Sequence, residues 1–296
     1  MKIIVIRALI LSIVLVGAGH AALSADLFQD LKKAVEQQTQ KKPEPGKPES
    51  NPGGAVDLGI MRSFTGFSQE EEIAIGRQAA GNILGAAPLT KDVRLQQYVN
   101  RVGRWVASQS ERPDLHWHFG VIETNDLNAF AAPGGYVFIT KGLYRMLQSE
   151  SELAGVLAHE IGHVIKKHHL KLLQQGRLVD IGGKLLVKQA GENAEIKNLI
   201  GNGAEIFARS LDKNAEFEAD RIGVVLAARA GYDPFGLPAV LQDLGHVAKD
   251  DSRVGLLFKT HPLPDDRLAR LGESVDDRFD GFKGLTLENR FVRIGP

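Results

Sequence analysis

The chain has 296 residues, of which 43% are hydrophobic and 24% are charged, so it can build a domain with a sizeable core. Lysine plus arginine and aspartate plus glutamate number 36 each, so net charge indicates neither a nucleic-acid partner nor an anionic membrane. Cysteine is absent, which excludes disulfides, a thiol nucleophile, cysteine-ligated zinc and a lipid-modified N-terminal cysteine. Any metal must therefore be held by His, Asp or Glu.

Residues 1–25 have the order of a secretory signal peptide, in which Lys2 and Arg7 precede an apolar run and a stretch of small residues. Cleavage is expected after Ala21, Ala22 or Ala25. The alternative is an uncleaved anchor, but the apolar run is interrupted by Arg7 and is short for a span of roughly 20 residues. We therefore expect a periplasmic protein that is exported and is not a lipoprotein.

Residues 26–57 are predicted to hold a short helix, 26–38, followed by a Pro/Gly-rich linker. The folded domain is then expected to cover 58–296. It begins with a helix whose capping box pairs Ser68 with Glu71.

A second helix is predicted over 91–108, and alternating apolar residues predict strands at 116–123 and 136–140. The Gly134-Gly135 pair predicts a turn before the later strand. A helix is expected over 149–170, with a capping box of Ser149 and Glu152, and helical periodicity returns over 203–230. These elements predict a mainly helical α+β fold with a small sheet.

The helix over 149–170 carries the motif H-E-x-x-H, formed by His159, Glu160 and His163. Two histidines four residues apart lie on one helix face and can chelate one zinc ion. Glu160 is then placed to take a proton from an activated water molecule. Apolar residues on both sides indicate a buried helix, although hydrogen-bonded core histidines are the simpler alternative.

The third ligand is the next question. His169 has metzincin spacing, but residue 166 is Lys where that geometry needs Gly. On a continuing helix His169 would lie about 15 Å from His159 along the axis, so His168 and His169 are expected to cap or solvate the helix end.

Glu216 is the better third ligand, because it shares a helix face with Asp220. In gluzincins a glutamate completes the site and an aspartate one turn later orients a ligand histidine. Glu218 is expected to point away into solvent. The alternative is an ordinary solvated acidic face.

Five ordered segments resemble the gluzincin peptidase family that includes the CAAX prenyl proteases, HtpX, BepA and LoiP. They are SQEEEIAIGRQ, NAFAAPGGYVFITKGLY, ELAGVLAHEIGHV, EFEADRIG and THPLPDDRLARL, which together span most of 66–271. The resemblance implies a zincin fold with one zinc on His159, His163 and Glu216, with Glu160 as general base and Asp220 behind a ligand. BepA-like members carry helical repeats after the catalytic domain, and the matching segments here are expected to correspond only to the protease half of BepA.

The resemblance also implies roles outside the metal ligands. An edge strand above the zinc helix is expected to bind substrate backbone, with Asn128 and Ala129 at its start and Gly134 and Gly135 in its turn. A plain core hairpin is the alternative.

His261, on an extended loop between prolines and a helix, is expected to approach the zinc. It would either block the open position or donate to the developing oxyanion, and Arg267 would hold the loop or contact the substrate carbonyl.

We therefore expect a zinc endopeptidase that degrades misfolded envelope proteins. One alternative is a zinc-containing chaperone-like scaffold without hydrolysis, against which the intact Glu160 speaks. Another is a structural zinc site, which usually has four protein ligands. The sequence leaves open the substrate, the oligomeric state, association with the membrane surface, and whether 178–202 is a lid or faces a membrane.

Overall fold

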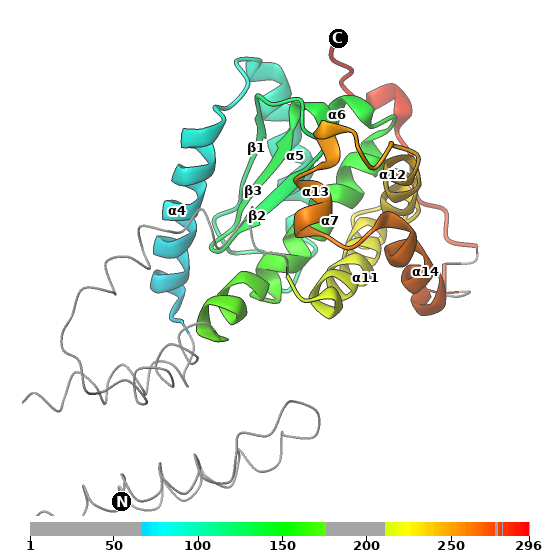
Figure 1. Cartoon of the computed structure of the whole chain (residues 1–296). Coiled ribbons are helices and arrows are strands. Elements are labelled where there is room, and N and C mark those ends of the chain that lie inside the picture. Colours follow the sequence, from blue (N-terminus) through cyan, green and yellow to red (C-terminus); the bar gives the residue numbers. More distant parts are fainter. Residues whose placement is uncertain (1–66, 176–210, 276–277, 280, 296) are drawn as a thin grey trace, which may run out of the picture. The chain divides into compact units, whose positions relative to one another are not determined.

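The computed structural model describes residues 67–175, 211–275, 278–279 and 281–295 (Figure 1). The predicted signal peptide, the short helix with its linker, the 178–202 segment and the first residues of the predicted 203–230 helix lie outside the described residues. Among the helices that are described, none has the length and hydropathy needed to cross a lipid bilayer.

A small mixed sheet has the strand order β1-β3-β2. Strand β1, His118–Ile122, runs parallel to β3, Tyr136–Thr140, and β2, Ala129–Ala132, pairs antiparallel with β3. The predicted turn joins β2 to β3, where Gly134 and Gly135 have φ angles of 75° and 93°. Such angles are strained for any residue with a Cβ, so the glycine pair is required by the hairpin.

The two faces of the sheet are covered by different helices, as Figure 1 shows. Helix α4, Gln69–Ala86, covers one face, where Ala80 packs with Ile122 and Phe138. Its predicted capping box is present. The opposite face packs against α5, Val93–Ala107, and α7, Glu150–Ile165. The alternation of side chains along each strand therefore divides the sheet between two apolar clusters.

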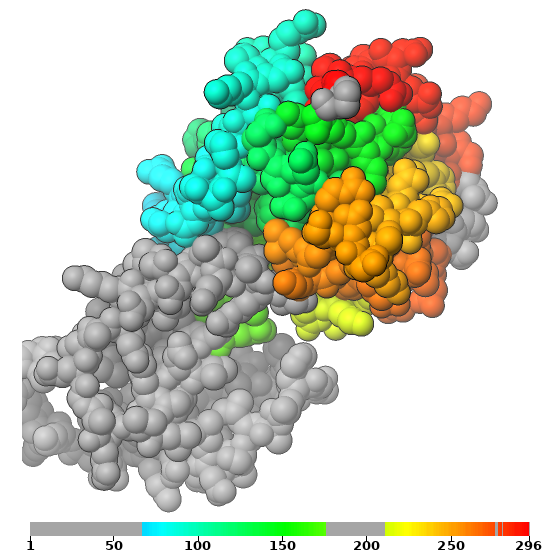
Figure 2. Space-filling model, turned by 45° about the horizontal axis from the view of Figure 1, so that its top comes forward, coloured from blue at the N-terminus to red at the C-terminus, as the bar shows by residue number. Residues whose placement is uncertain are grey.

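Further helices, of which α11 is as long as α7, follow the sheet in the described fold. They are α6 Lys141–Met146, α11 Lys213–Arg229, α12 Gly236–Gly245, η1 Ser252–Val254, α13 Leu257–Thr260, α14 Pro264–Val275 and η2 Glu288–Arg290. Figure 2 shows the orange segment around α13 lying directly against the green part of the molecule. Its backbone is tied there, because Leu127 N–H donates to the Arg253 carbonyl.

Helices α7 and α11 approach each other closely because glycines lie at their contact. A Cβ on Gly223 of α11 would lie 3.0 Å from the backbone nitrogen of His159, and one on Gly162 of α7 would lie 3.2 Å from Ala219 Cα. The missing side chains let the two backbones pack against each other. This contact brings the acidic residues of α11 beside the histidines of α7.

The prediction of one continuous helix over 149–170 is wrong. Helix α7 ends at Ile165, Lys167 adopts the left-handed conformation with φ 56°, and a new helix begins at His168. The chain therefore changes direction instead of carrying the next histidines along the axis.

The capping box predicted at the start of α7 is only half formed. The Ser149 side chain accepts from the Glu152 N–H, as predicted. The Glu152 carboxylate, however, accepts from the Gln148 N–H and the Ser149 hydroxyl instead of the Ser149 N–H.

Candidate metal centre

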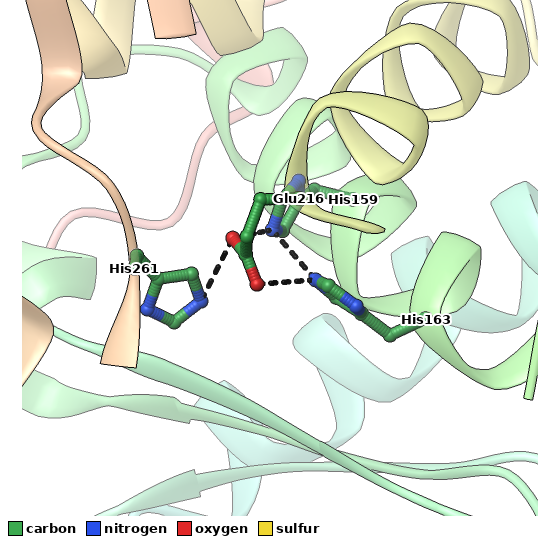
Figure 3. A group of neighbouring side chains, drawn as sticks. All are labelled: His159, His163, Glu216 and His261. Carbon is green, nitrogen blue, oxygen red and sulfur yellow. Dashed lines mark hydrogen bonds and ion pairs between the residues drawn. The ribbon is translucent and has the colours of Figure 1, made fainter. Parts of the chain in front are cut away.

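Four side chains from three elements converge at one point, as Figure 3 shows. His159 and His163 come from α7 and Glu216 comes from α11, whereas His261 directly follows α13. One potential ligand atom from each lies within 4.8 Å of the others.

The two α7 histidines point the same ring nitrogen at this centre. His159 Nε2 and His163 Nε2 are 3.0 Å apart, and His163 Nε2 lies 3.5 Å from Glu216 Oε1. Burial lowers the pKa of both imidazoles, which keeps them in the neutral form that binds metals.

Glu216 provides the test of whether a cation fits here. Its side chain is fully buried, and neither carboxylate oxygen has a hydrogen-bond partner among the described residues. Burial raises the pKa of this carboxyl well above its ordinary value. An ionised carboxylate without a partner is costly in the interior, so the arrangement fits a metal ion shared with the two imidazoles.

Asp220 orients His159 from behind. The His159 Nδ1 atom is 2.8 Å from Asp220 Oδ1, so a proton on Nδ1 leaves the Nε2 lone pair for the metal. Burial alone would raise the pKa of Asp220, but the Arg267 guanidinium and His159 hold it below its ordinary value. Asp220 therefore stays ionised and fixes the ring of its neighbour.

Arg267 is buried and its guanidinium engages Asp220, with Nε donating to Oδ2 over 3.0 Å. Arg267 thus links α14, which follows the His261 loop, to the acid behind His159.

Glu160 and the start of β2 line the cavities beside the ligands. One cavity is lined by Ala129, Phe130, Ala131, Glu160, His163, His169, Leu211, Glu216, Thr260 and His261. The other is mostly apolar and is lined by Asn128, Ala129, Leu143, Val156, His159, Glu160, Leu237, Val240, Leu241, Leu244, Leu257, His261 and Arg267. Gly134 and Gly135 line neither cavity, so the structure places them in the hairpin turn and not at the centre.

Two histidines that the sequence argument set aside lie close to the centre. His168 Nδ1 is 3.0 Å from His163 Nδ1, and the ring centroids of His163 and His169 are 6.0 Å apart. The expectation that His168 caps or solvates the helix end is wrong, because the residue is 4% exposed and its ring contacts His163 and Glu218. Glu218, expected to point into solvent, contacts His168 Nε2 at 3.2 Å.

The sequence carries little signal for the turn after α7. Every residue from Glu150 to Val164 is buried, so α7 has no single apolar face whose phase could shift at its end.

Comparison with known protein families gives a match that covers these residues. The pattern of Peptidase family M48 matches residues 94–275. The chain is 35% identical over 221 residues to the beta-barrel assembly-enhancing protease of Yersinia pestis, covering 72% of this chain and 45% of that protein. The protein of the same name from Escherichia coli K12 is 34% identical over 221 residues, with the same coverage.

Mitochondrial metalloendopeptidase OMA1 of Arabidopsis thaliana is 26% identical over 215 residues, which cover 72% of this chain and 42% of that protein. The chain thus spans less than half the length of these relatives.

Proposed function

Because the chain belongs to peptidase family M48, we propose that it is a zinc-dependent endopeptidase acting on exported envelope proteins. Family membership confirms the predicted gluzincin resemblance, the mainly helical zincin fold with a small sheet, and zinc as the cofactor. The observation that carries the proposal is the buried carboxylate of Glu216 between two imidazoles, which accepts no hydrogen bond from the described residues, with Glu160 lining the adjoining cavity.

His159, His163 and Glu216 would hold the ion. A bound zinc ion supplies Lewis-acid chemistry, polarising a peptide carbonyl and making water more acidic. Glu160 would take the proton from the attacking water and return it to the leaving amine. Burial, partly offset by the Arg267 guanidinium, raises the pKa of Glu160 to about 8, so the carboxyl can exchange a proton near neutral pH.

The edge of the sheet supports binding of an extended peptide. Strand β2 pairs with β3 on one side only among the described strands, and its residues Ala129 to Ala131 line the cavity that contains Glu160. A peptide backbone could add to this edge as another strand. Asn128 Nδ2 is buried without a hydrogen-bond partner among the described residues and borders the apolar cavity. That amide could donate to a substrate carbonyl.

His261 supports a restraining role. Its Nε2 lies 3.7 Å from Glu216 Oε2, so His261 is a fourth candidate ligand. Catalytic zinc sites keep one position open, whereas four protein ligands close the site. We propose that His261 blocks the metal in this conformation and withdraws when substrate binds; donation to the oxyanion is the alternative.

The scaffold and structural-zinc readings remain alternatives to hydrolysis. Closure by a fourth ligand is the observation that favours a structural site. The position of Glu160 argues against both, because a carboxyl lining the cavity beside the ligands is costly and serves no purpose in a purely structural site.

Digestion of casein with and without a chelator, run beside Glu160→Gln, tests the function. The wild type is expected to cut casein only when zinc is present. Glu160→Gln should keep its zinc and fold while its rate falls roughly 10²–10⁴-fold, because an amide cannot accept the proton. Chelator-insensitive digestion would contradict the metal mechanism, and a zinc-loaded wild type without activity would favour a scaffold.

The biological role is proposed from the relatives and the N-terminus. The first relatives are named for enhancing β-barrel assembly, and residues 1–25 have signal-peptide features. We propose a periplasmic enzyme, without a lipid anchor, that removes misfolded or misassembled envelope proteins. Cell fractionation tests the location, and recovery of this protein only in the cytoplasm would contradict it.

A further inference from the structure

We propose that His168 and Glu218 act as positioning residues for the ligand His163. Hydrogen bonds from Glu218 on the surface of α11, through His168, fix the orientation of the His163 ring at the metal centre. This inference rests on the proposed zinc site but not on peptide hydrolysis. It is carried by two consecutive contacts, His163 Nδ1 to His168 Nδ1 at 3.0 Å and His168 Nε2 to Glu218 Oε2 at 3.2 Å.

These contacts allow one consistent assignment of protons on neutral rings. The Nε2 lone pair of His163 must face the metal, so its proton is on Nδ1 and donates to His168 Nδ1. His168 then carries its own proton on Nε2 and donates it to the carboxylate of Glu218. Reversing either ring would place two donors or two acceptors together, so the carboxylate at the end sets the tautomer of both rings.

The rings of the two ligand histidines are oriented by different contacts. His159 contacts the buried Asp220 directly, whereas His163 reaches Glu218 through a second imidazole. Glu218 is two residues from both Glu216 and Asp220, which places it about 200° around the helix from each. An acid on that flank of α11 cannot reach the metal, but it can reach His168.

The reversal after α7 is held in place by a buried acid. Lys167, in its left-handed conformation, places Nζ 3.2 Å from Glu72 Oε2, and Arg112 also donates to that carboxylate. The backbone N–H of Gly134 donates to Glu72 as well. Glu72 of α4 thus connects two turns. One is the turn after α7, which positions His168, and the other is the hairpin between β2 and β3.

Zinc affinity is the decisive measurement, made by chelator competition in full-length Glu160→Gln protein so that self-cleavage does not interfere. His168→Ala should weaken zinc binding roughly 10–100-fold. His168→Asn should restore most of the affinity, because its Oδ1 occupies nearly the place of the imidazole Nδ1 and can accept the His163 proton. Thermal melting of the metal-free variants separates this role from a general loss of stability.

Glu218→Ala should weaken zinc binding in the presence of His168 but have no effect in the His168→Asn background, where the connection is already cut. Glu111→Ala is the matched control, because Glu111 and Glu218 both pair with Lys166 and only Glu218 contacts a histidine. Glu111→Ala should leave zinc affinity unchanged.

Three results would overturn the proposal. They are unchanged zinc affinity in His168→Ala, an equal effect of Glu218→Ala in both backgrounds, and a loss of affinity fully explained by a lower melting temperature of the metal-free protein. If wild-type protein binds zinc with this dependence on His168 and Glu218 yet cuts no casein, the proposed hydrolysis fails and the positioning role is supported.

Discussion

At the scale of single residues, the metal centre combines two neutral imidazoles with a carboxyl that has no hydrogen-bond partner among the described residues. Without a cation these buried side chains do not stabilise one another, since burial opposes charge on all of them. A cation changes that balance, because it favours the ionised form of the carboxyl and uses the lone pairs of the rings. The ligand set therefore makes binding sensitive to pH and to the fourth side chain.

Zinc affinity should increase as the pH rises above the ordinary pKa of a glutamate carboxyl, about 4.3. Burial raises the pKa of Glu216, so its carboxyl holds a proton that zinc must displace, while burial lowers the pKa of His159 and His163, which are already neutral. Calorimetry of Glu160→Gln in buffers of different ionisation enthalpy should find about one proton released per ion. Affinity that is independent of pH would contradict competition between zinc and a proton on Glu216.

His261→Ala should increase casein digestion and self-cleavage, because it removes the fourth candidate ligand and opens the metal to substrate. Initial rates are compared with His246→Ala, which changes an exposed histidine after α12 and should match wild type. A rate roughly 10²-fold lower would show that His261 serves the transition state instead.

At the scale of elements, the site depends on how closely α7 and α11 approach. The glycines at their contact allow Glu216 and Asp220 on one helix to meet His163 and His159 on the other. The close approach also leaves no space for a larger residue. Changes at this contact should therefore affect stability and metal binding together.

Gly223→Ala should destabilise the fold by about 1–3 kcal/mol and weaken zinc binding, because its Cβ would press on the backbone of His159. Gly272→Ala in α14 is the control, since a Cβ there meets nothing within 4 Å. It should stabilise the protein by about 0.4–1 kcal/mol and leave the metal unaffected. Chemical denaturation and zinc competition measure both effects, and equal behaviour of the two variants would contradict the packing argument.

At the scale of the whole described fold, the segment near the C-terminus completes the main apolar cluster. Phe291 is 7% exposed and stacks on Tyr144 with ring centroids 5.1 Å apart. Nearby, the Tyr144 hydroxyl donates to the carbonyl of Val292, and Arg290 pairs with the buried Glu150 at the start of α7. These contacts fasten the end of the chain to the helix that carries the metal ligands.

Phe291→Ala should lower the free energy of unfolding by about 3–5 kcal/mol, because it leaves a cavity beside Tyr144. Phe282→Ala removes the same side chain from a position that is 44% exposed, so its effect should be within about 0.5 kcal/mol. Urea denaturation compares the two. Similar losses would mean that the segment around Phe291 does not contribute to the core in solution.

The sequence alone determined what depends on short spacings. Four features involve residues within one turn of each other, where backbone geometry decides the outcome. They are the zinc motif on one helix, the shared helix face of Glu216 and Asp220, the capping box at Ser68 and the glycine turn before β3. The convergence of His159, His163 and Glu216, and the approach of His261, agree with what the family resemblance implied. The predicted uses of Asn128, Ala129, His261 and Arg267 in catalysis stay predictions.

Only the tertiary structure decided where α7 ends and what the next histidines do. The left-handed Lys167 contacts Glu72, which lies on a helix much earlier in the chain, and no glycine or proline near residue 166 marks the turn. Conformations of this kind are unfavourable locally and persist where distant contacts stabilise them. His168 and Glu218 met for the same reason, because their contact requires both that turn and the close packing of α7 on α11.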